Sequence, residues 1–131
     1  MIKEGYASDY NKKKRGYVRP ANSGTVILIT RWKPSYYQEL WLDLDSDEWI
    51  DQLSPQPETL RKWQESKQSE EDWQIYLDEF YPQMKQSGSV AAMNALSQRV
   101  KNGETITLLC YCKHNVHCHR YIIKWMIESL L

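Results

Sequence analysis

The sequence predicts a single small α/β domain with a mostly parallel sheet of few strands flanked by helices. Two unbroken β-branched and aliphatic runs, at residues 25–30 and 105–112, carry this prediction, together with helical periodicity between and after them. Such runs are typical of strands buried on both faces, as in a parallel sheet. Because 131 residues suffice for one hydrophobic core but not two, residues 1–131 are expected to form one domain.

The first part of the chain is expected to contain a basic loop at residues 7–24. This segment has a Lys12–Arg15 basic run and then Pro20-Ala21-Asn22-Ser23-Gly24, and it has little apolar area to bury. The strand 25–30 follows it, and Arg31 and Pro34 come directly after the strand.

The middle of the chain contains helix signals. Ser69 and Asp72 have the spacing of a capping box. The face that follows is Trp73, Tyr76, Leu77 and Phe80, and this helix is expected to end near Pro82. A second helix is expected from Ser89, with Val90, Met93, Leu96 and Val100 inward and Gly103 as its stop. Short helices are expected at 35–42, 46–53 and 57–66.

The last unit is a strand, a short loop and a helix. The strand at 105–112 is followed by a loop from Lys113 to His117, and Cys118 or His119 begins the helix. The apolar stripe of that helix is expected to include Tyr121, Ile122, Trp125, Met126 and Leu130.

Charge and cysteine content narrow the class of protein. The net charge is zero, but the charges are segregated along the chain. Residues 1–33 have eight basic and two acidic side chains, residues 34–82 have three basic and thirteen acidic ones, and residues 83–131 have six basic and two acidic ones. The chain has no apolar run of membrane-spanning length and no signal-peptide pattern, so no membrane partner is expected. Three cysteines within nine positions do not suit a disulfide framework, which favours a cytoplasmic protein with reduced thiols.

A cluster of reactive side chains lies at the end of the second strand. All three cysteines and all three histidines fall between Cys110 and His119, and Arg120 follows. Ligands of open α/β sheets bind beyond the carboxyl ends of strands, and the next helix presents its N-terminus there. A thiol near a helix N-terminus and a cation has a lowered pKa, and an arginine binds phosphate or carboxylate in a bidentate manner. The cluster therefore indicates an anion pocket or an activated-thiol site.

Within this cluster, roles follow from position. Cys118 is the preferred nucleophile and Cys112 the second, whereas Cys110 is expected in the core. His119 or His117 would act as acid or base, and Arg120 with Arg31 would clamp the anion if the two strands are adjacent and parallel.

A metal site is the competing interpretation. Cys112, His114, His117 and Cys118 provide ligands of the type that zinc prefers. Structural zinc sites usually join ligand pairs from distant segments, and here every ligand lies on one short stretch. We therefore expect no metal or other cofactor, with zinc as the weaker alternative.

The run Leu108-Leu109-Cys110-Tyr111-Cys112-Lys113, followed by the Cys118-His119-Arg120 triplet, resembles the domain of unknown function 488 family. The strand ending in Arg31 and followed by Pro34, and the stretch Leu53-Ser54-Pro55 with Leu60, are similar to other parts of that family. The resemblance covers most of residues 25–131. It implies an α/β domain with the triplet in a pocket, and it supports Cys118, His119 and Arg120, with Cys112 and Arg31, as site residues. It implies no particular reaction.

Three functions remain open. The first is an enzyme or binding domain for a phosphate-bearing small molecule or nucleic acid at the Cys/His/Arg pocket. The second is a non-catalytic nucleic-acid-binding module that uses the basic 12–19 loop with Tyr10 and Tyr17. The third is a protein-interaction domain that uses the acidic 34–82 face. The sequence does not indicate an oligomeric state.

Overall fold

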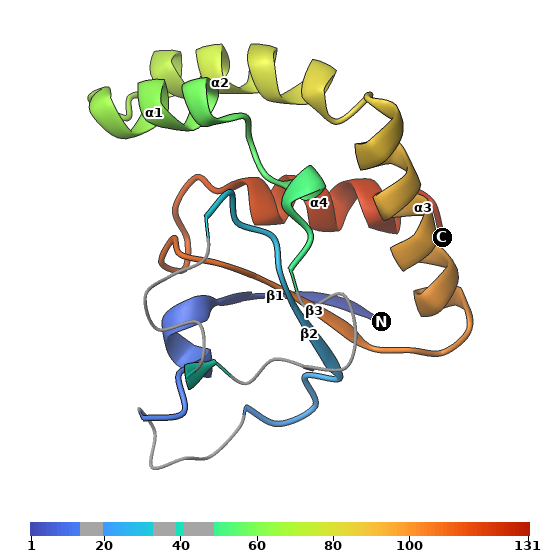
Figure 1. The fold of residues 1–131 in the computed structure, drawn as a ribbon. Coiled ribbons are helices and arrows are strands. Elements are labelled where there is room, and N and C mark those ends of the chain that lie inside the picture. Colours follow the sequence, from blue (N-terminus) through green and yellow to red (C-terminus); the bar gives the residue numbers. More distant parts are fainter. Residues whose placement is uncertain (14–19, 33–38, 41–48) are drawn as a thin grey trace.

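The computed structural model describes residues 1–13, 20–32, 39–40 and 49–131. Its centre is a three-stranded parallel sheet of β1 (Ile2–Tyr6), β2 (Thr25–Leu28) and β3 (Ile106–Cys110), in the order β1-β3-β2 (Figure 1). Ile106 of β3 lies in register with Ile2 on one side and Thr25 on the other. The predicted α/β class with a parallel sheet is therefore confirmed.

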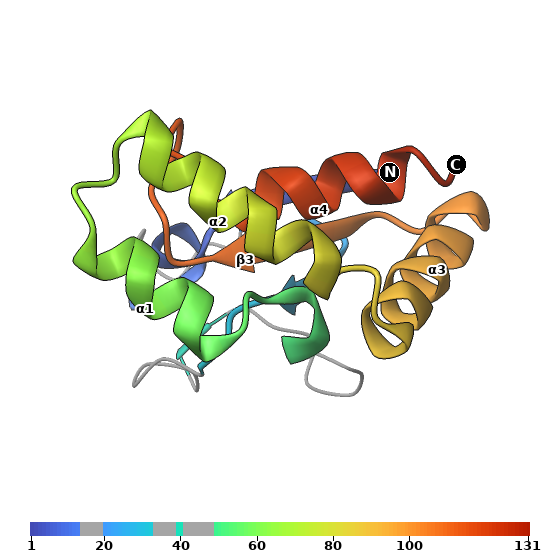
Figure 2. The same ribbon diagram turned by 90° about the horizontal axis from the view of Figure 1, so that it is seen from above.

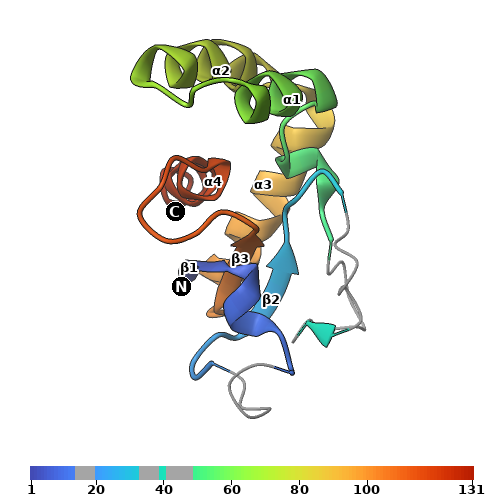
Figure 3. The same ribbon diagram turned by 90° about the vertical axis from the view of Figure 1, so that its left-hand side faces the viewer.

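The helices cover one face of this sheet. They are α1 (Pro57–Glu65), α2 (Glu70–Gln83), α3 (Ser87–Lys101) and α4 (His119–Glu128). In Figure 3, α4 and α3 lie next to the sheet, and α1 with α2 form a further layer above α4. Seen from above in Figure 2, α1 and α2 run side by side and span the end of the sheet at which α4 begins. The opposite face carries the short 3-10 helix η1 (Ala7–Tyr10).

Strand alternation divides the core into two parts. On the helix side, Ile106 and Leu108 of β3 pack with Ile27 of β2, together with Phe80 of α2 and Ile123 of α4. Leu109, Val26 and Leu28 point to the other face and pack with Ala7, Tyr10 and Leu40. Since residues two apart share a face, Cys110 points to the helix side, as Leu108 does.

The strand β1 was not predicted. Its sequence, Ile2-Lys3-Glu4-Gly5-Tyr6, is short and rich in residues that are depleted in strands, so local propensity gives no signal for it. Its position comes from pairing with β3, and Ile2 lies in the helix-side core.

A glycine makes the turn before β2. Gly24 has a φ of 63°, and a Cβ atom there would lie 2.1 Å from the Thr105 carbonyl oxygen. Both the left-handed backbone and the close approach require glycine at this position.

Most of the predicted helices are present with small shifts. The Ser69–Asp72 capping box forms at the start of α2, and Gly103, with a φ of 96°, follows the end of α3. The helix predicted at 57–66 corresponds to α1. The segment 35–42 lies largely outside the described residues, and within 46–53 the described part contains a 3-10 turn, η4 (Asp51–Leu53).

Two predicted helix faces need correction. Val90 is exposed, because the buried positions of α3 begin at Ser89 and continue through Met93 and Leu96. In α4 the predicted Ile122 and Met126 are partly buried and pack against the core, but the buried apolar positions are Ile123 and Ile127, and the predicted Trp125 is 61% exposed. The loop expected at 7–24 contains η1, whose Tyr10 is buried and hydrogen-bonded to Ser23, and its residues 14–19 lie outside the described part.

Among the described residues, none of the helices combines the length and the apolar character needed to cross a membrane.

Candidate functional site

Three thiols meet where β3 ends and α4 begins. The Sγ atoms of Cys110, Cys112 and Cys118 all lie within 4.8 Å of one another. Cys110 is the last residue of β3, Cys112 follows in the loop, and Cys118 is the N-cap residue of α4. Cys110 and Cys118 are buried, whereas Cys112 is partly exposed. Cys110 was expected to be plain core; it is buried, but its sulfur belongs to the cluster.

The ring of His119 connects this cluster to β2. Its Nε2 atom lies 2.6 Å from the carbonyl oxygen of Ile29, and its Nδ1 atom lies 3.7 Å from Cys110 Sγ and 3.8 Å from Cys118 Sγ. A carbonyl oxygen only accepts hydrogen bonds, so Nε2 carries a proton and donates it. In the neutral ring, Nδ1 therefore presents a lone pair to the sulfurs.

Arg120 holds the loop between β3 and α4 in place. Its side chain is buried, and its Nε donates to Glu4 Oε2 of β1 at 2.6 Å. Its two terminal nitrogens donate to the carbonyl oxygens of Cys112 and Lys113, to the Tyr121 hydroxyl and to Cys118 Sγ. These five contacts match the five N–H groups of a guanidinium. The structure thus gives Arg120 a positioning role. The sequence allowed such a role with an acidic partner from residues 34–82, whereas the acidic partner in the structure is Glu4.

Arg31 is engaged in a similar way. Its guanidinium donates to the carbonyl oxygens of Pro55, Asp51 and Ser54, and one nitrogen lies 3.9 Å from Asp51 Oδ2. The strands β2 and β3 are adjacent and parallel, which was the condition under which Arg31 and Arg120 were expected to share one site, and Arg31 lines the cavity described next. Arg120 does not appear among the residues lining that cavity.

An aromatic cavity of about 110 Å³ opens onto the three thiols. Trp63 of α1 and Trp73 and Tyr76 of α2 form much of its wall. Their rings are in mutual contact: the Trp73 ring is 5.1 Å from that of Trp63 and stacks on Tyr76 at 4.6 Å. The cavity is also lined by Cys110, Cys112, Cys118 and His119.

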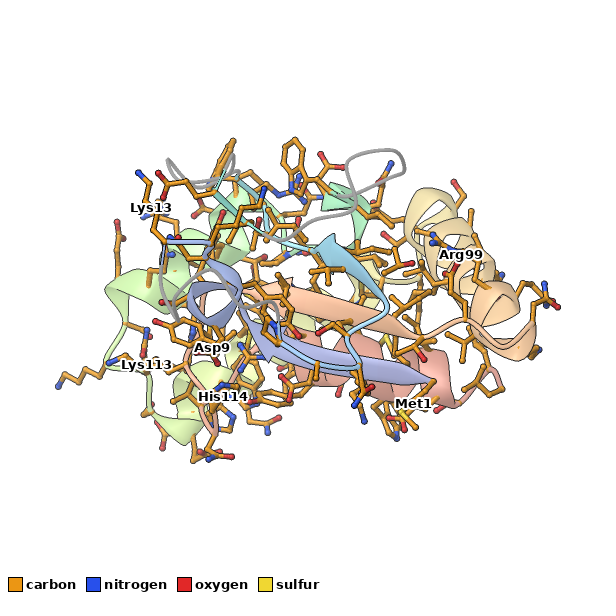
Figure 4. The ribbon with its side chains drawn as sticks, turned by 90° about the horizontal axis from the view of Figure 1, so that it is seen from below. Met1, Asp9, Lys13, Arg99, Lys113 and His114 are labelled. Atoms are coloured by element: carbon orange, nitrogen blue, oxygen red, sulfur yellow. The ribbon has the colours of Figure 1, made fainter. Side chains whose placement is uncertain are left out.

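A wider hollow adjoins this cavity on the solvent side. Trp63, Tyr111, Cys112 and His117 line both spaces, and the outer hollow also has Lys113, Asn115, Val116 and Gln68 in its wall. Cys112 is the member of the thiol cluster that borders both. Lys113 is exposed, and Figure 4 shows its side chain extending outward from the same end of the molecule as Asp9 and His114.

The two exposed histidines have acidic partners. His117 Nε2 lies 2.7 Å from Glu70 Oε1, and the ring stacks on Trp73 with centroids 4.5 Å apart. His114 Nε2 lies 2.8 Å from Asp9 Oδ2, and Figure 4 places both residues side by side. His117 therefore stands at the cavity, as the sequence anticipated, while His114 belongs to the η1 side of the loop.

The electrostatics of the cluster favour one thiolate. Hydrogen bonds from Cys110 and Cys118 lower the pKa of Cys112. The two donor thiols have raised pKa values in return. The hydrogen bond to Cys112 raises the pKa of Cys110 to about 12, and hydrogen bonds with both other thiols raise the pKa of Cys118. Burial opposes charge on His119, but the Cys118 sulfur, the Ile29 carbonyl oxygen and the Cys112 sulfur together outweigh it and raise the pKa of the imidazole. These contacts favour the thiolate charge on Cys112, which the sequence analysis placed second after Cys118.

Comparison with known proteins identifies the family. A family model described as the active DUF488-N3 subclade, DUF488-N3a, matches residues 12–130. The chain belongs to the DUF488 family. The Cys118-His119-Arg120 triplet that suggested this family begins α4, next to the cavity. No curated protein and no solved structure shows significant similarity to this DUF488 protein.

Several site residues were not identifiable from sequence. Trp63, Trp73 and Tyr76 have the helical spacing of ordinary core residues, and only the tertiary arrangement places them around the thiols. Glu4 lies on an unpredicted strand far from Arg120 in sequence. For Cys110 a signal did exist, because residues two apart in a strand point to the same face, which places Cys110 beside Cys112.

Proposed function

We propose that this DUF488 protein binds a nucleotide-like ligand, with an aromatic ring in the inner cavity and a phosphate in the outer hollow. The observation that carries the proposal is the pair of adjoining spaces, one walled by rings and the other bordered by Lys113. The proposal assigns one chemical group of the ligand to each space.

The size of the cavity supports a ligand that occupies both spaces. At about 110 Å³ the inner cavity is well below the roughly 300–1,000 Å³ typical of small-molecule pockets, so it accommodates one part of a ligand. Rings stack on planar bases, and each stacked base contributes about 1–3 kcal/mol. The partly buried ring of Trp63 borders both spaces and suits this contact.

The phosphate is assigned to Lys113 because the two arginines are engaged by the protein itself. Arg120 uses its five N–H groups on Glu4, the loop carbonyl oxygens and neighbouring side chains, and Arg31 donates to three carbonyl oxygens. Lys113 is exposed at the rim, with its carbonyl group held by Arg120. An exposed lysine attracts phosphate as a point charge, and this attraction weakens with salt.

Cys112 is the side chain best situated to contact the ligand between its ring and its phosphate. It borders both spaces, whereas Cys110 and Cys118 line the inner cavity. The interpretation differs from the sequence-based one in two ways. It assigns the anion to Lys113 instead of Arg120 with Arg31, and it places Cys112, the second candidate there, ahead of Cys118. A nucleic acid would bind in the same way through a single flipped-out nucleotide, so the test includes an oligonucleotide.

The test is binding by calorimetry of a nucleoside, the matching nucleoside monophosphate, ribose 5-phosphate and a short single-stranded oligonucleotide. We expect the monophosphate to bind more tightly than either fragment. Lys113→Glu should weaken binding of the monophosphate but leave binding of the nucleoside unchanged, and Trp63→Leu should weaken binding of both.

Lys101→Glu is the matched control, since this exposed lysine ends α3 away from both spaces. The proposal is refuted if none of the ligands binds, or if Lys113→Glu and Lys101→Glu affect the monophosphate equally. If only the oligonucleotide binds, the ligand is a nucleic acid and not a free nucleotide.

A further inference from the structure

We infer that Cys110, Cys112, Cys118 and His119 form a four-ligand binding site for a divalent zinc-type cation. The inference concerns the thiol cluster beneath the cavity and is independent of whether a nucleotide binds above it. It departs from the ligand set weighed from sequence, which contained His114 and His117 and omitted Cys110 and His119.

The geometry of the cluster is close to the tetrahedron that zinc requires. With Zn–S near 2.3 Å and Zn–N about 2.0–2.1 Å, the edges of a tetrahedral site are about 3.8 Å between sulfurs and about 3.6 Å from sulfur to nitrogen. The three sulfurs lie within 4.8 Å of one another, and His119 Nδ1 lies 3.7 and 3.8 Å from two of them. Completing the polyhedron requires the three sulfurs to draw together and Cys112 Sγ to approach Nδ1.

The orientation of His119 is that of a metal ligand. Histidines that bind metals usually donate their second ring N–H to a carbonyl or carboxylate, which fixes the tautomer and directs the other nitrogen at the metal. The 2.6 Å contact of Nε2 with the Ile29 carbonyl oxygen does this, and Nδ1 is left facing the sulfurs.

Arg120 supplies the outer support that such a site needs. Three thiolates and one neutral imidazole around a divalent cation carry one net negative charge. The Arg120 guanidinium donates to Cys118 Sγ at 3.7 Å, and the N-terminus of α4 adds the positive end of its dipole. The Cys118-His119-Arg120 triplet would thus provide two ligands and one hydrogen-bond donor to a ligand.

The folding of the loop removes the sequence argument against a metal. All four ligands lie on one short stretch, which is unusual for structural zinc sites. Arg120 draws the loop back by binding the carbonyl oxygens of Cys112 and Lys113, so the end of β3 and the start of α4 meet. Strand and helix then act as the two separate segments that usually contribute ligand pairs.

The donor set defines the class of cation. Three thiolates with an imidazole match the softer preference of zinc among abundant divalent ions, and they disfavour magnesium and calcium, which take oxygen ligands. Cys112 would be held as a thiolate by the metal, because a coordinating thiol is deprotonated. The partly exposed sulfur would thus face the cavity as a metal-bound thiolate.

The first experiment measures zinc in the full chain, purified without chelators, by mass spectrometry of the metal. We expect close to one zinc per chain. Cobalt added to the stripped protein should give the visible absorption of a tetrahedral thiolate complex, and zinc should displace it.

Variants separate ligands from neighbours. Cys112→Ser, at the partly exposed position, and His119→Ala should each lose zinc or change the cobalt spectrum. His117→Ala and His114→Ala are the controls, because neither residue belongs to the cluster, and both should retain the metal. If Cys118→Ser or Cys110→Ser fails to fold, the cobalt spectrum of Cys112→Ser still shows whether the thiols bind the metal.

The inference is overturned if the purified chain contains no zinc, the stripped chain gives no cobalt–thiolate absorption, and all three thiols react with a disulfide reagent at the same rate with and without zinc. Retention of one zinc by both Cys112→Ser and His119→Ala, with unchanged cobalt spectra, would also overturn it. Nucleotide binding is measured in a separate experiment, so the presence or absence of zinc does not decide whether a nucleotide binds.

Discussion

Replacing Arg120 with lysine tests whether this residue holds the site together or serves a ligand. The substitution keeps the positive charge but reduces five N–H donors on three nitrogens to three on one. The acceptors around Arg120 include Glu4 Oε2 and two carbonyl oxygens of the loop, which lie around different nitrogens of the guanidinium. A single ammonium cannot reach all of them.

The magnitude follows from the acceptors that are left without partners. A buried acceptor deprived of its donor costs about 1–3 kcal/mol. At least two acceptors would be affected, and because they are only partly buried we expect a loss of about 2–4 kcal/mol in the free energy of unfolding. This is a large share of the about 5–15 kcal/mol typical of a domain. Arg61→Lys is the control, since Arg61 is 53% exposed and pairs only with Glu58 and Glu65 on its own helix; we expect less than about 1 kcal/mol.

The assay is urea unfolding at neutral pH, followed by tryptophan fluorescence and circular dichroism. The midpoint should fall for Arg120→Lys with an unchanged slope, because a changed slope would indicate a different unfolded or native state. A loss no greater than that of Arg61→Lys would refute the reasoning. It would mean that the five contacts stabilise nothing and that the guanidinium is available to a ligand.

Two further predictions concern local structure. Ser69→Ala should cost about 1 kcal/mol in urea unfolding through loss of the α2 cap. Hydrogen bonds from Ser69 lower the pKa of Asp72, so the carboxylate's part of this stabilisation is present above the unfolded pKa of about 3.9 and lost as pH falls through the folded value. The stability difference between parent and variant should therefore shrink in strong acid to the part that comes from the Asp72 N–H bond to Ser69 Oγ, and a difference that does not change with pH would contradict this. Gly24→Ala should destabilise far more than Gly103→Ala, because a Cβ at Gly24 meets the Thr105 carbonyl while the one at Gly103 meets open space; equal losses in the same assay would show that positive φ alone matters.

The parts of the fold that could be predicted are those with strong local patterns. β2 and β3 are unbroken apolar runs, and the start of α2 has both a capping box and an apolar face. β1 could not be predicted, since a strand with Lys3, Glu4 and Gly5 acquires its structure from pairing with β3. The face of α4 was misjudged because several apolar residues surround the helix, and only packing decides that Ile123 is inside and Trp125 outside.

For the site, the sequence located the region but not the roles. The concentration of cysteine and histidine beyond β3 is visible in the chain, and it does lie beside a cavity. The partners that decide each role come from elsewhere: Glu4 engages Arg120 from β1, Ile29 orients His119 from β2, and the rings of α1 and α2 wall the cavity. Such contacts between distant segments have no counterpart in local sequence.

The strand order has a consequence for how the chain folds as it is synthesised. β1 and β2 are not neighbours; each pairs with β3, which is made much later, and the amino group of Met1 bonds the carbonyl oxygen of Glu104, 103 positions along the chain. During translation the first two strands must therefore wait with unpaired edges until residues 106–110 leave the ribosome. We expect nascent chains arrested before this point to be protease-sensitive and dependent on chaperones, and folding to begin only when the central strand appears.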